Sequence, residues 1–211
     1  MTTSSNLSVR QLGRGDAHAF RVIRLKALKE EGEKFGPTFE SEAGLSEEEW
    51  EKRVTPTEDT RVFGLFDGED LVGIVRVTQW DEDPSGKTAL WGQAYVLPQY
   101  RGRRDENGEK FTASLYAGRA DFTFEQHPRY TSAVTFIRQD NTVSQDALSK
   151  YEKESMPSRL MNWPGREPVM WNFYRITANY CGCQNPATRL CGNMLFRRTL
   201  ATNVTAAFNN N

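Results

Sequence analysis

The residues with the clearest chemical potential form a turn that follows an apolar stretch. Residues 91–97 are mostly apolar, predict a β-strand and lead into Pro98. The turn after them combines glycine with positive charge and contains Arg101, Gly102, Arg103 and Arg104. A helix is expected to begin near Gly108, and the unpaired N–H groups at a helix start attract an anion. The layout therefore predicts a phosphate-binding turn, although an ordinary strand–loop–helix connection with solvated arginines explains this segment alone equally well.

A second polar segment follows another predicted strand. Residues 130–137 are rich in β-forming side chains and end in a polar turn. Asn141 or Thr142 can cap the helix that is expected next, and Ser144 lies in its first turn. On its own this segment indicates only a strand and a capped helix.

Taken together, the two segments resemble the GCN5-related N-acetyltransferase (GNAT) family. Residues 94–103, AYVLPQYRGR, resemble the family's acetyl-CoA signature YVxPxYRGxG. Residues 138–144, RQDNTVS, resemble its R-x-x-N-x-x-S segment at the start of the next helix. Flanking segments extend the resemblance over about residues 7–177. The order of these segments along the chain carries the inference, because no single motif is decisive.

The resemblance implies a fold and a cosubstrate. The fold would be α/β, with a mixed, mostly antiparallel sheet flanked by helices, and the cosubstrate would be acetyl-CoA. The residues that it assigns to cofactor binding are Tyr95, Val96, Arg101, Gly102, Arg103, Arg104, Gly108, Asn141 and Ser144. Tyr95 and Val96 would act through main-chain atoms along the pantetheine arm. For Asn141 a plain helix cap is an equally good interpretation, and the residue could serve both roles.

The turn departs from the family pattern. Residues 104–108 look like an insertion before the helix, and Asp105 and Glu106 would repel a pyrophosphate if they pointed inward. Arg104 and Gly108 could restore the anion site, or the loop could bulge away from it. A catalytically degenerate member that binds or senses CoA therefore stays open, as does an unrelated α/β phosphate-binding protein.

The catalytic groups are less well marked by the sequence. Many family members carry a tyrosine seven residues after the Asn, where this chain has Leu148, so Tyr151 is the candidate acid if the helix is shifted. A phenol with a pKa of about 10 suits a thiolate leaving group, but a surface or core-edge tyrosine is the alternative. Glu42, in the segment expected to shape the acceptor pocket, is the candidate base, unless it is a solvated member of an acidic run.

Composition bounds the function classes. The chain has 211 residues, a net charge of −1 and 37 % hydrophobic residues, which suits one globular domain and gives no bulk attraction to nucleic acid. No stretch approaches the about 18 apolar residues that a membrane span needs. The cysteines are odd in number and late in the chain, so we expect neither a disulfide framework nor a metal site from Cys181, Cys183 and Cys191. We expect a cytoplasmic protein, and a homodimer is left open.

The hydrophobic pattern predicts a single domain over residues 1–178, followed by a poorly packed tail over residues 179–211. Helices are expected over residues 17–29, 46–54, 109–126 and 142–153, and the last strand over residues 168–177. The leading hypothesis is an acetyl-CoA-dependent N-acetyltransferase that acts on a small amine. Direct attack in a ternary complex is expected, because no cysteine lies near the signature to form an acyl-enzyme.

Overall fold

The computed structural model describes residues 7–104, 108, 110–149, 151 and 153–177. Its strands form a seven-stranded sheet in the order β1-β2-β3-β4-β5-β7-β6. Their bounds are β1 Leu7–Gln11, β2 Arg61–Asp67, β3 Asp70–Gln79, β4 Thr88–Val96, β5 Ser132–Arg138, β6 Lys153–Met161 and β7 Val169–Thr177. Neighbouring strands are antiparallel except for β4 and β5, which are parallel. The prediction of a mixed, mostly antiparallel sheet is confirmed.

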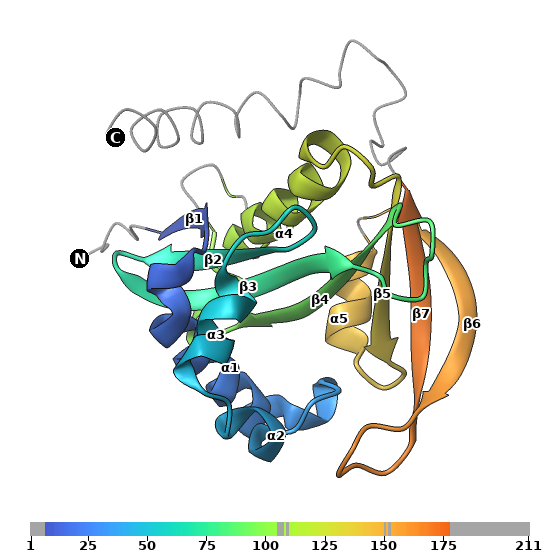
Figure 1. The fold of residues 1–211 in the computed structure, drawn as a ribbon, viewed down its shortest axis with the longest axis horizontal. Helices are drawn as coiled ribbons and strands as arrows, with labels where there is room; N and C mark the ends of the chain where they lie inside the picture. Colours follow the sequence, from blue (N-terminus) through green and yellow to red (C-terminus); the bar gives the residue numbers. More distant parts are fainter. Residues whose placement is uncertain (1–6, 105–107, 109, 150, 152, 178–211) are drawn as a thin grey trace. The chain divides into compact units, whose positions relative to one another are not determined.

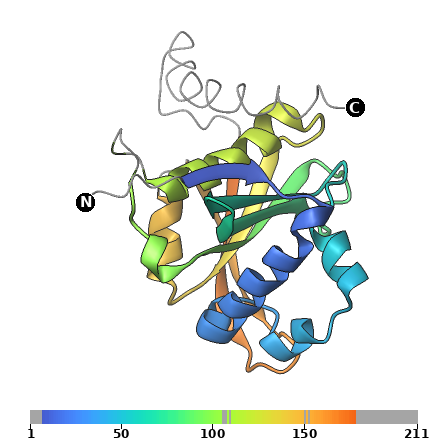
Figure 2. The same ribbon diagram turned by 90° about the vertical axis from the view of Figure 1, so that its left-hand side faces the viewer.

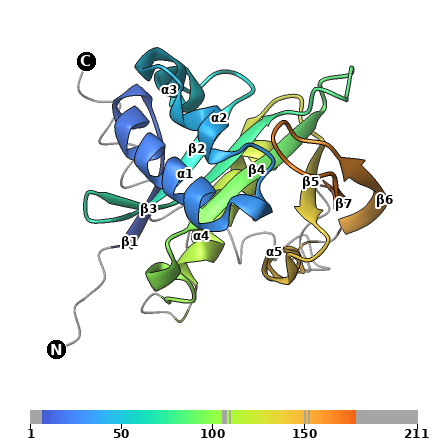
Figure 3. The same ribbon diagram turned by 90° about the horizontal axis from the view of Figure 1, so that it is seen from below.

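The helices divide between the two faces of the sheet. One face carries α1 (Ala17–Glu31), α2 (Phe39–Ala43) and α3 (Glu47–Val54), and the other carries α4 (Phe111–Asp121) and α5 (Thr142–Leu148), as Figure 3 shows. Figure 2 faces the β1 edge of the sheet, with α1 below β1 in that view. Short 3-10 turns span Arg14–Asp16, Gly32–Lys34 and Pro98–Tyr100, and a π-helical turn, Phe122–Gln126, ends α4.

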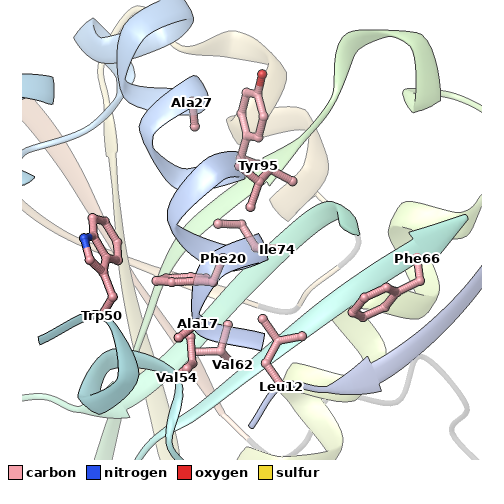
Figure 4. Packing of buried hydrophobic residues seen from close by; sticks show 11 residues of the cluster. Leu12, Ala17, Phe20, Ala27, Trp50, Val54, Val62, Phe66, Ile74 and Tyr95 are labelled. Atoms are coloured by element: carbon pink, nitrogen blue, oxygen red, sulfur yellow. The ribbon is translucent and has the colours of Figure 1, made fainter. Parts of the chain in front are cut away.

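An apolar core joins α1 and α3 to the sheet. Phe20 of α1 meets Trp50 of α3 edge-on, with ring centroids 5.9 Å apart, and Val62 and Ile74 of the sheet complete the cluster (Figure 4). Such burial is the main stabilising contribution to folding. It also fixes the position of α1, whose side chains reach the site described below.

The helix that starts after Ser46 shows why sequence patterns locate some elements well. Ser46 Oγ accepts a hydrogen bond from Glu49 N at 3.3 Å, and Glu49 Oε2 accepts one from Ser46 N at 2.7 Å. This reciprocal capping box satisfies two backbone donors that a helix start otherwise leaves unpaired. The predicted start and end of this helix agree with α3.

The parallel pair β4–β5 is short, and this shapes the centre of the sheet. Only Thr88, Ala89 and Leu90 of β4 pair with β5, while β4 stays paired with β3 up to Val96. The next β4 carbonyl, that of Trp91, accepts instead from the Thr135 hydroxyl at 3.0 Å. Beyond Leu90 the two strands separate, so the sheet opens along the middle of β4.

A bulge lies in the same part of β4. The register against β3 shifts between Ile74 and Arg76, which leaves an extra residue on β4. Gln93 has a φ of 53°, a left-handed backbone conformation that is uncommon for a residue other than glycine. Such a conformation costs free energy and persists where the surroundings impose it, often at functional sites.

One helix prediction is wrong at its C-terminal end. The helix expected over residues 142–153 ends at Leu148, and β6 begins at Lys153. The strand was missed because its sequence, KESMPSRLM, has no apolar alternation, which is possible for an edge strand with little burial. Pro157 falls at a register shift between Met156 and Arg159, where a missing N–H can be tolerated.

The predicted tail over residues 179–211, with its cysteines, lies outside the described residues. Within the part that the structure describes, no helix has the length and apolar composition to cross a membrane. The described residues also contain no group of three or more His, Cys, Asp or Glu side chains that could hold a metal ion.

Candidate functional site

A cavity of about 250 Å³ opens where β4 and β5 separate. Its floor is formed by β4 residues from Leu90 to Ala94 and by β5 residues from Thr135 to Ile137. Side chains from the α1 side and from the α4–α5 side both line it. The gap in the sheet therefore connects two differently constructed walls.

The α5 wall contains two residues that the sequence singled out. Asn141 Oδ1 accepts a hydrogen bond from Ser144 N at 3.2 Å, so Asn141 caps α5, and both residues line the cavity. Ala147 and Leu148 continue this wall one turn later. The cap and the wall are thus made by the same short helix, as the dual interpretation of Asn141 expects.

The α4 wall is aromatic and cationic. Arg119 is 4 % exposed, and its guanidinium carbon lies 4.2 Å from the Trp91 ring centroid and 4.9 Å from that of Tyr116. Burial lowers the pKa of Arg119, an effect that the neighbouring Tyr151 and Tyr116 oppose. Tyr116 and Arg119 both line the cavity, and neither was singled out from the sequence.

Tyr151 lies behind this wall. Its ring meets Trp91 edge-on at 5.3 Å and interacts with Arg119, but it is not among the residues that line the cavity. Burial raises the pKa of Tyr151, and the Arg119 charge counteracts that shift. In this arrangement Tyr151 supports Trp91 and Arg119.

The α1 wall carries arginines and one buried carboxylate. Arg24 donates to Glu42 through Nε at 2.9 Å and Nη2 at 3.0 Å, and Arg53 Nη1 lies 3.2 Å from Glu42 Oε1. Glu42 is 2 % exposed and does not line the cavity. Two guanidiniums thus occupy the carboxylate, and its evident role is to hold Arg24.

Arg76 of β3 lines the same wall without such a partner. Its Nε is buried and has no hydrogen-bond partner among the described residues. Burial, followed by repulsion from Arg53 and Arg24, lowers the pKa of Arg76 to about 10. Arg76 pairs in register with Gly92, where an added Cβ would find no atom within 4 Å. The cavity therefore has open space directly beside an unpaired guanidinium.

The turn after β4 is organised differently from the sequence expectation. Arg101 donates through Nε to Val96 O at 2.8 Å and through Nη2 to Glu31, so its side chain ties the end of β4 to α1. Arg103 stacks on Tyr100 at 4.6 Å. Arg104 Nη1 donates to Gly108 O at 2.5 Å, and Arg104 forms an isolated antiparallel bridge with Lys110. The predicted insertion at Asp105 and Glu106 lies outside the described residues. Gly102 has a φ of 73°, which a glycine adopts without strain.

Tyr95 and Val96 occupy the last positions of β4 and have buried side chains. The Tyr95 hydroxyl donates to Glu30 at 2.8 Å, and burial is the main reason that the pKa of Tyr95 is raised. The resemblance implies a main-chain role for these two residues, and the Val96 carbonyl already accepts from Arg101 Nε.

Comparisons with known proteins show which solved structures share this architecture. Neither family models nor curated proteins give a match to the sequence. Solved structures do: a GNAT-family acetyltransferase from Streptococcus pneumoniae has a TM-score of 0.66 at 13 % identity, covering 82 % of this chain and 99 % of that chain. The chain has the GNAT fold.

Two further neighbours with the GNAT fold were solved with ligands. A Salmonella typhimurium protein assigned as an acetyltransferase, with its cofactor acetyl-CoA, has a TM-score of 0.62 at 14 % identity and covers 86 % of this chain and 99 % of its own. Spermidine N-acetyltransferase from Vibrio cholerae, solved with CoA and spermine, has a TM-score of 0.59 at 16 % identity. The match covers 83 % of this chain and 98 % of that chain. In this chain, β4 separates from β5 on the way to Tyr95 and Val96, to which the resemblance assigns the pantetheine arm.

Two cavity residues that were not singled out from the sequence, Arg24 and Arg76, did carry a signal there. Arg24 lies on the apolar face of α1, between Ile23 and Ala27, and Arg76 interrupts the apolar run of β3. A charged residue at a core position needs a buried partner, a ligand or solvent access. That argument identifies both arginines, but not which of them is paired.

Proposed function

We propose that the protein is an acetyl-CoA-dependent N-acetyltransferase that acetylates the amine of a small molecule by direct attack in a ternary complex. The observation that carries the proposal is the cavity at the point where β4 leaves β5. Neighbours of the same fold that were solved with acetyl-CoA, or with CoA and spermine, support it. Acetyl-CoA would supply the activated acetyl group.

The main chain of β4 fits an extended pantetheine arm. Beyond Leu90, β4 has no strand partner on its β5 side in the described sheet. Apart from the Trp91 and Val96 carbonyls, which accept from Thr135 and Arg101, its backbone groups there would be available to a ligand. Asn141 and Ser144 lie along the opposite border of the opening and would contact the same arm or its phosphates. Gly102 and the arginines beside it would bind the pyrophosphate, which requires Arg101 to leave Glu31 or to act from its present position.

Tyr116 is the phenol best placed to act as the proton donor. It lines the cavity next to Arg119, whereas the earlier candidate Tyr151 lies behind Trp91. General acid catalysis contributes about 100- to 10,000-fold to a rate. We expect Tyr116→Phe to lower kcat by at least about tenfold, and Tyr151→Phe to act mainly on stability; loss of kcat in Tyr151→Phe alone would return the role to Tyr151.

A degenerate CoA-binding module is the second candidate. Leu148 occupies the position where many GNAT members carry a tyrosine, and Arg101 is engaged by Glu31. This protein would bind acetyl-CoA without turnover. Binding alone therefore does not separate the two candidates, and an acetyl-transfer assay is needed beside it.

The test combines calorimetry with release of the CoA thiol. We expect the wild type to bind acetyl-CoA and Ala147→Phe, which fills the α5 wall, to bind at least about tenfold more weakly. Val22→Phe, at a position 55 % exposed on α1, is the matched control and should bind normally. Arg101→Ala is less informative, because its side chain also anchors the end of β4.

No acetyl-CoA binding by the wild type would overturn both candidates. Binding without thiol release on any amine would favour the degenerate module. A cytoplasmic location and a homodimer stay predictions.

A further inference from the structure

We infer that the acceptor amine carries a carboxylate, which binds Arg76 on the α1 side of the cavity. The inference rests on the proposed acetyltransferase function and names the chemical class of its substrate.

The first observation is an imbalance of charge. Arg24, Arg53 and Arg76 interact with one another and with a single buried carboxylate, Glu42. Bidentate bonds to Arg24 and a third bond to Arg53 use both oxygens of that carboxylate. Three guanidiniums thus share one carboxylate, with Arg24 fully buried and Arg53 and Arg76 partly buried, so an anion bound here would meet an excess of positive charge.

The second observation is the position of the free donors. Arg76 Nε and Arg24 Nη1 are buried, and neither has a hydrogen-bond partner within the described part of the chain. Arg24 is 1 % exposed, so water does not compensate freely for its missing bond. Both residues line the cavity, so a ligand bound there would lie against their side chains.

The charged side chains that line the cavity are all positive. Lys34 joins Arg24 and Arg76 on the α1 side, and the described lining includes no aspartate or glutamate. Lys34 keeps Glu31 as an ion-pair partner at 2.9 Å, so Arg76 is the principal unpaired cation there. A polyamine, with several positive charges, would meet repulsion from these groups.

The phosphates of the cosubstrate do not explain these arginines. Arg24 lies on α1 and Arg76 packs toward it, whereas Asn141 and Ser144, proposed for the cosubstrate, lie on α5 at the opposite face of the sheet (Figure 3). The anion needed by Arg76 therefore belongs to the molecule that enters from the α1 side, which is the acceptor.

Cavity size and acceptor protonation agree with a small amino acid. About 250 Å³ is below the usual range of ligand pockets, about 300–1,000 Å³, and Gly92 keeps the space beside Arg76 open. Nearby guanidiniums also lower the pKa of a bound ammonium group and favour the neutral amine that attacks. The same cations would thus anchor the carboxylate and help to deprotonate the nucleophile, without a carboxylate base in the cavity.

The experiment uses matched acceptors that differ in the anionic group. Alanine is compared with ethylamine, and phenylalanine with 2-phenylethylamine, by calorimetry on the CoA-loaded protein and by thiol release with acetyl-CoA. We expect the carboxylate member of each pair to bind roughly 10- to 100-fold more tightly, as a charge-assisted hydrogen bond would give. 1-Aminoethylphosphonate tests whether a phosphonate replaces the carboxylate.

Arg76→Gln removes the guanidinium and should abolish that preference while acetyl-CoA affinity is unchanged. Arg14→Gln is the control: it removes the same charge from an exposed arginine that pairs with Glu51, and the preference for the carboxylate should remain. Equal or tighter binding of the decarboxylated amines, of spermine or of the aminophosphonate, with acetyl-CoA bound normally, would overturn the inference and leave the proposed function intact. Absence of acetyl-CoA binding would overturn the proposed function, and this inference with it.

Discussion

Two arginines on the same wall of the cavity have opposite situations. Arg24 is held by Glu42 with two hydrogen bonds, at 2.9 and 3.0 Å, whereas Arg76 has no carboxylate partner among the described residues. A guanidinium that donates two hydrogen bonds to a buried carboxylate stabilises the fold, and breaking that pair costs free energy of folding. A half-buried guanidinium that lines a cavity without a carboxylate partner can bind an anionic ligand. The contrast shows that charge in a cavity indicates function only after its internal partners are known.

Removing the carboxylate of the paired arginine should have the largest effect. Glu42→Gln leaves Arg24 and Arg53 without a counter-charge, and we expect a loss of about 3–5 kcal/mol in the free energy of unfolding by urea denaturation. Glu48→Gln, which breaks the exposed pair with Lys52, is the control and should be nearly silent. Unchanged stability with loss of turnover in Glu42→Gln would instead make Glu42 the catalytic base that the sequence suggested.

Blocking the space beside the unpaired arginine should affect binding. Gly92→Val places a side chain opposite Arg76, and we expect acceptor binding to weaken by about tenfold or more in calorimetry. Gly13→Val is the matched control, because Gly13 has extended backbone and open space but lies outside the cavity lining. Normal acceptor affinity in Gly92→Val would show that the ligand does not approach Arg76 from β4.

Neutralising the unpaired arginine should barely change stability. Burial already lowers the pKa of Arg76 to about 10, so its charge is poorly compensated in the folded protein. We expect Arg76→Gln to shift the free energy of unfolding by at most about 1 kcal/mol, toward greater stability. A loss as large as that of Glu42→Gln would mean that Arg76 is part of the structural cluster.

We expect the smallest effect from Asp83, a carboxylate in the turn before β4, and this effect depends on pH. Hydrogen bonds, first of all from the Ser85 side chain, lower the pKa of Asp83 from 3.8 to about 2. The folded-state pKa is depressed, so the stabilisation is present above pH 3.8 and is lost as the pH falls toward 2. Asp83→Asn should flatten the fall of the thermal midpoint across that window, and an unchanged slope would exclude this contribution.

The sequence predicted the parts of the fold whose side chains carry a local pattern. The Ser46 capping box and the apolar run of β4 both have local causes. The sequence did not predict β6, because the mostly exposed side chains of this edge strand show no alternation of apolar and polar residues. Pairing with β7 creates that strand, and pairing partners are not local information.

The candidate site divides in the same way. Asn141 and Ser144 were singled out by the resemblance to the R-x-x-N-x-x-S segment, and both line the cavity. Glu42 could not be placed, because its burial depends on Arg24, which lies a whole helix away in the chain. Tyr116 and Arg119 gave no signal either, because their position depends on the docking of α4 against Trp91.

The most direct test of the account is hydrogen exchange of the β4 backbone with and without acetyl-CoA. The central claim is that β4 beyond Leu90 is an open strand edge that receives the cosubstrate. We predict that acetyl-CoA protects amides within residues 91–96 and at the start of α5, and leaves β1 and β2 unchanged. Binding without protection of residues 91–96 would contradict the claim and move the cosubstrate site elsewhere.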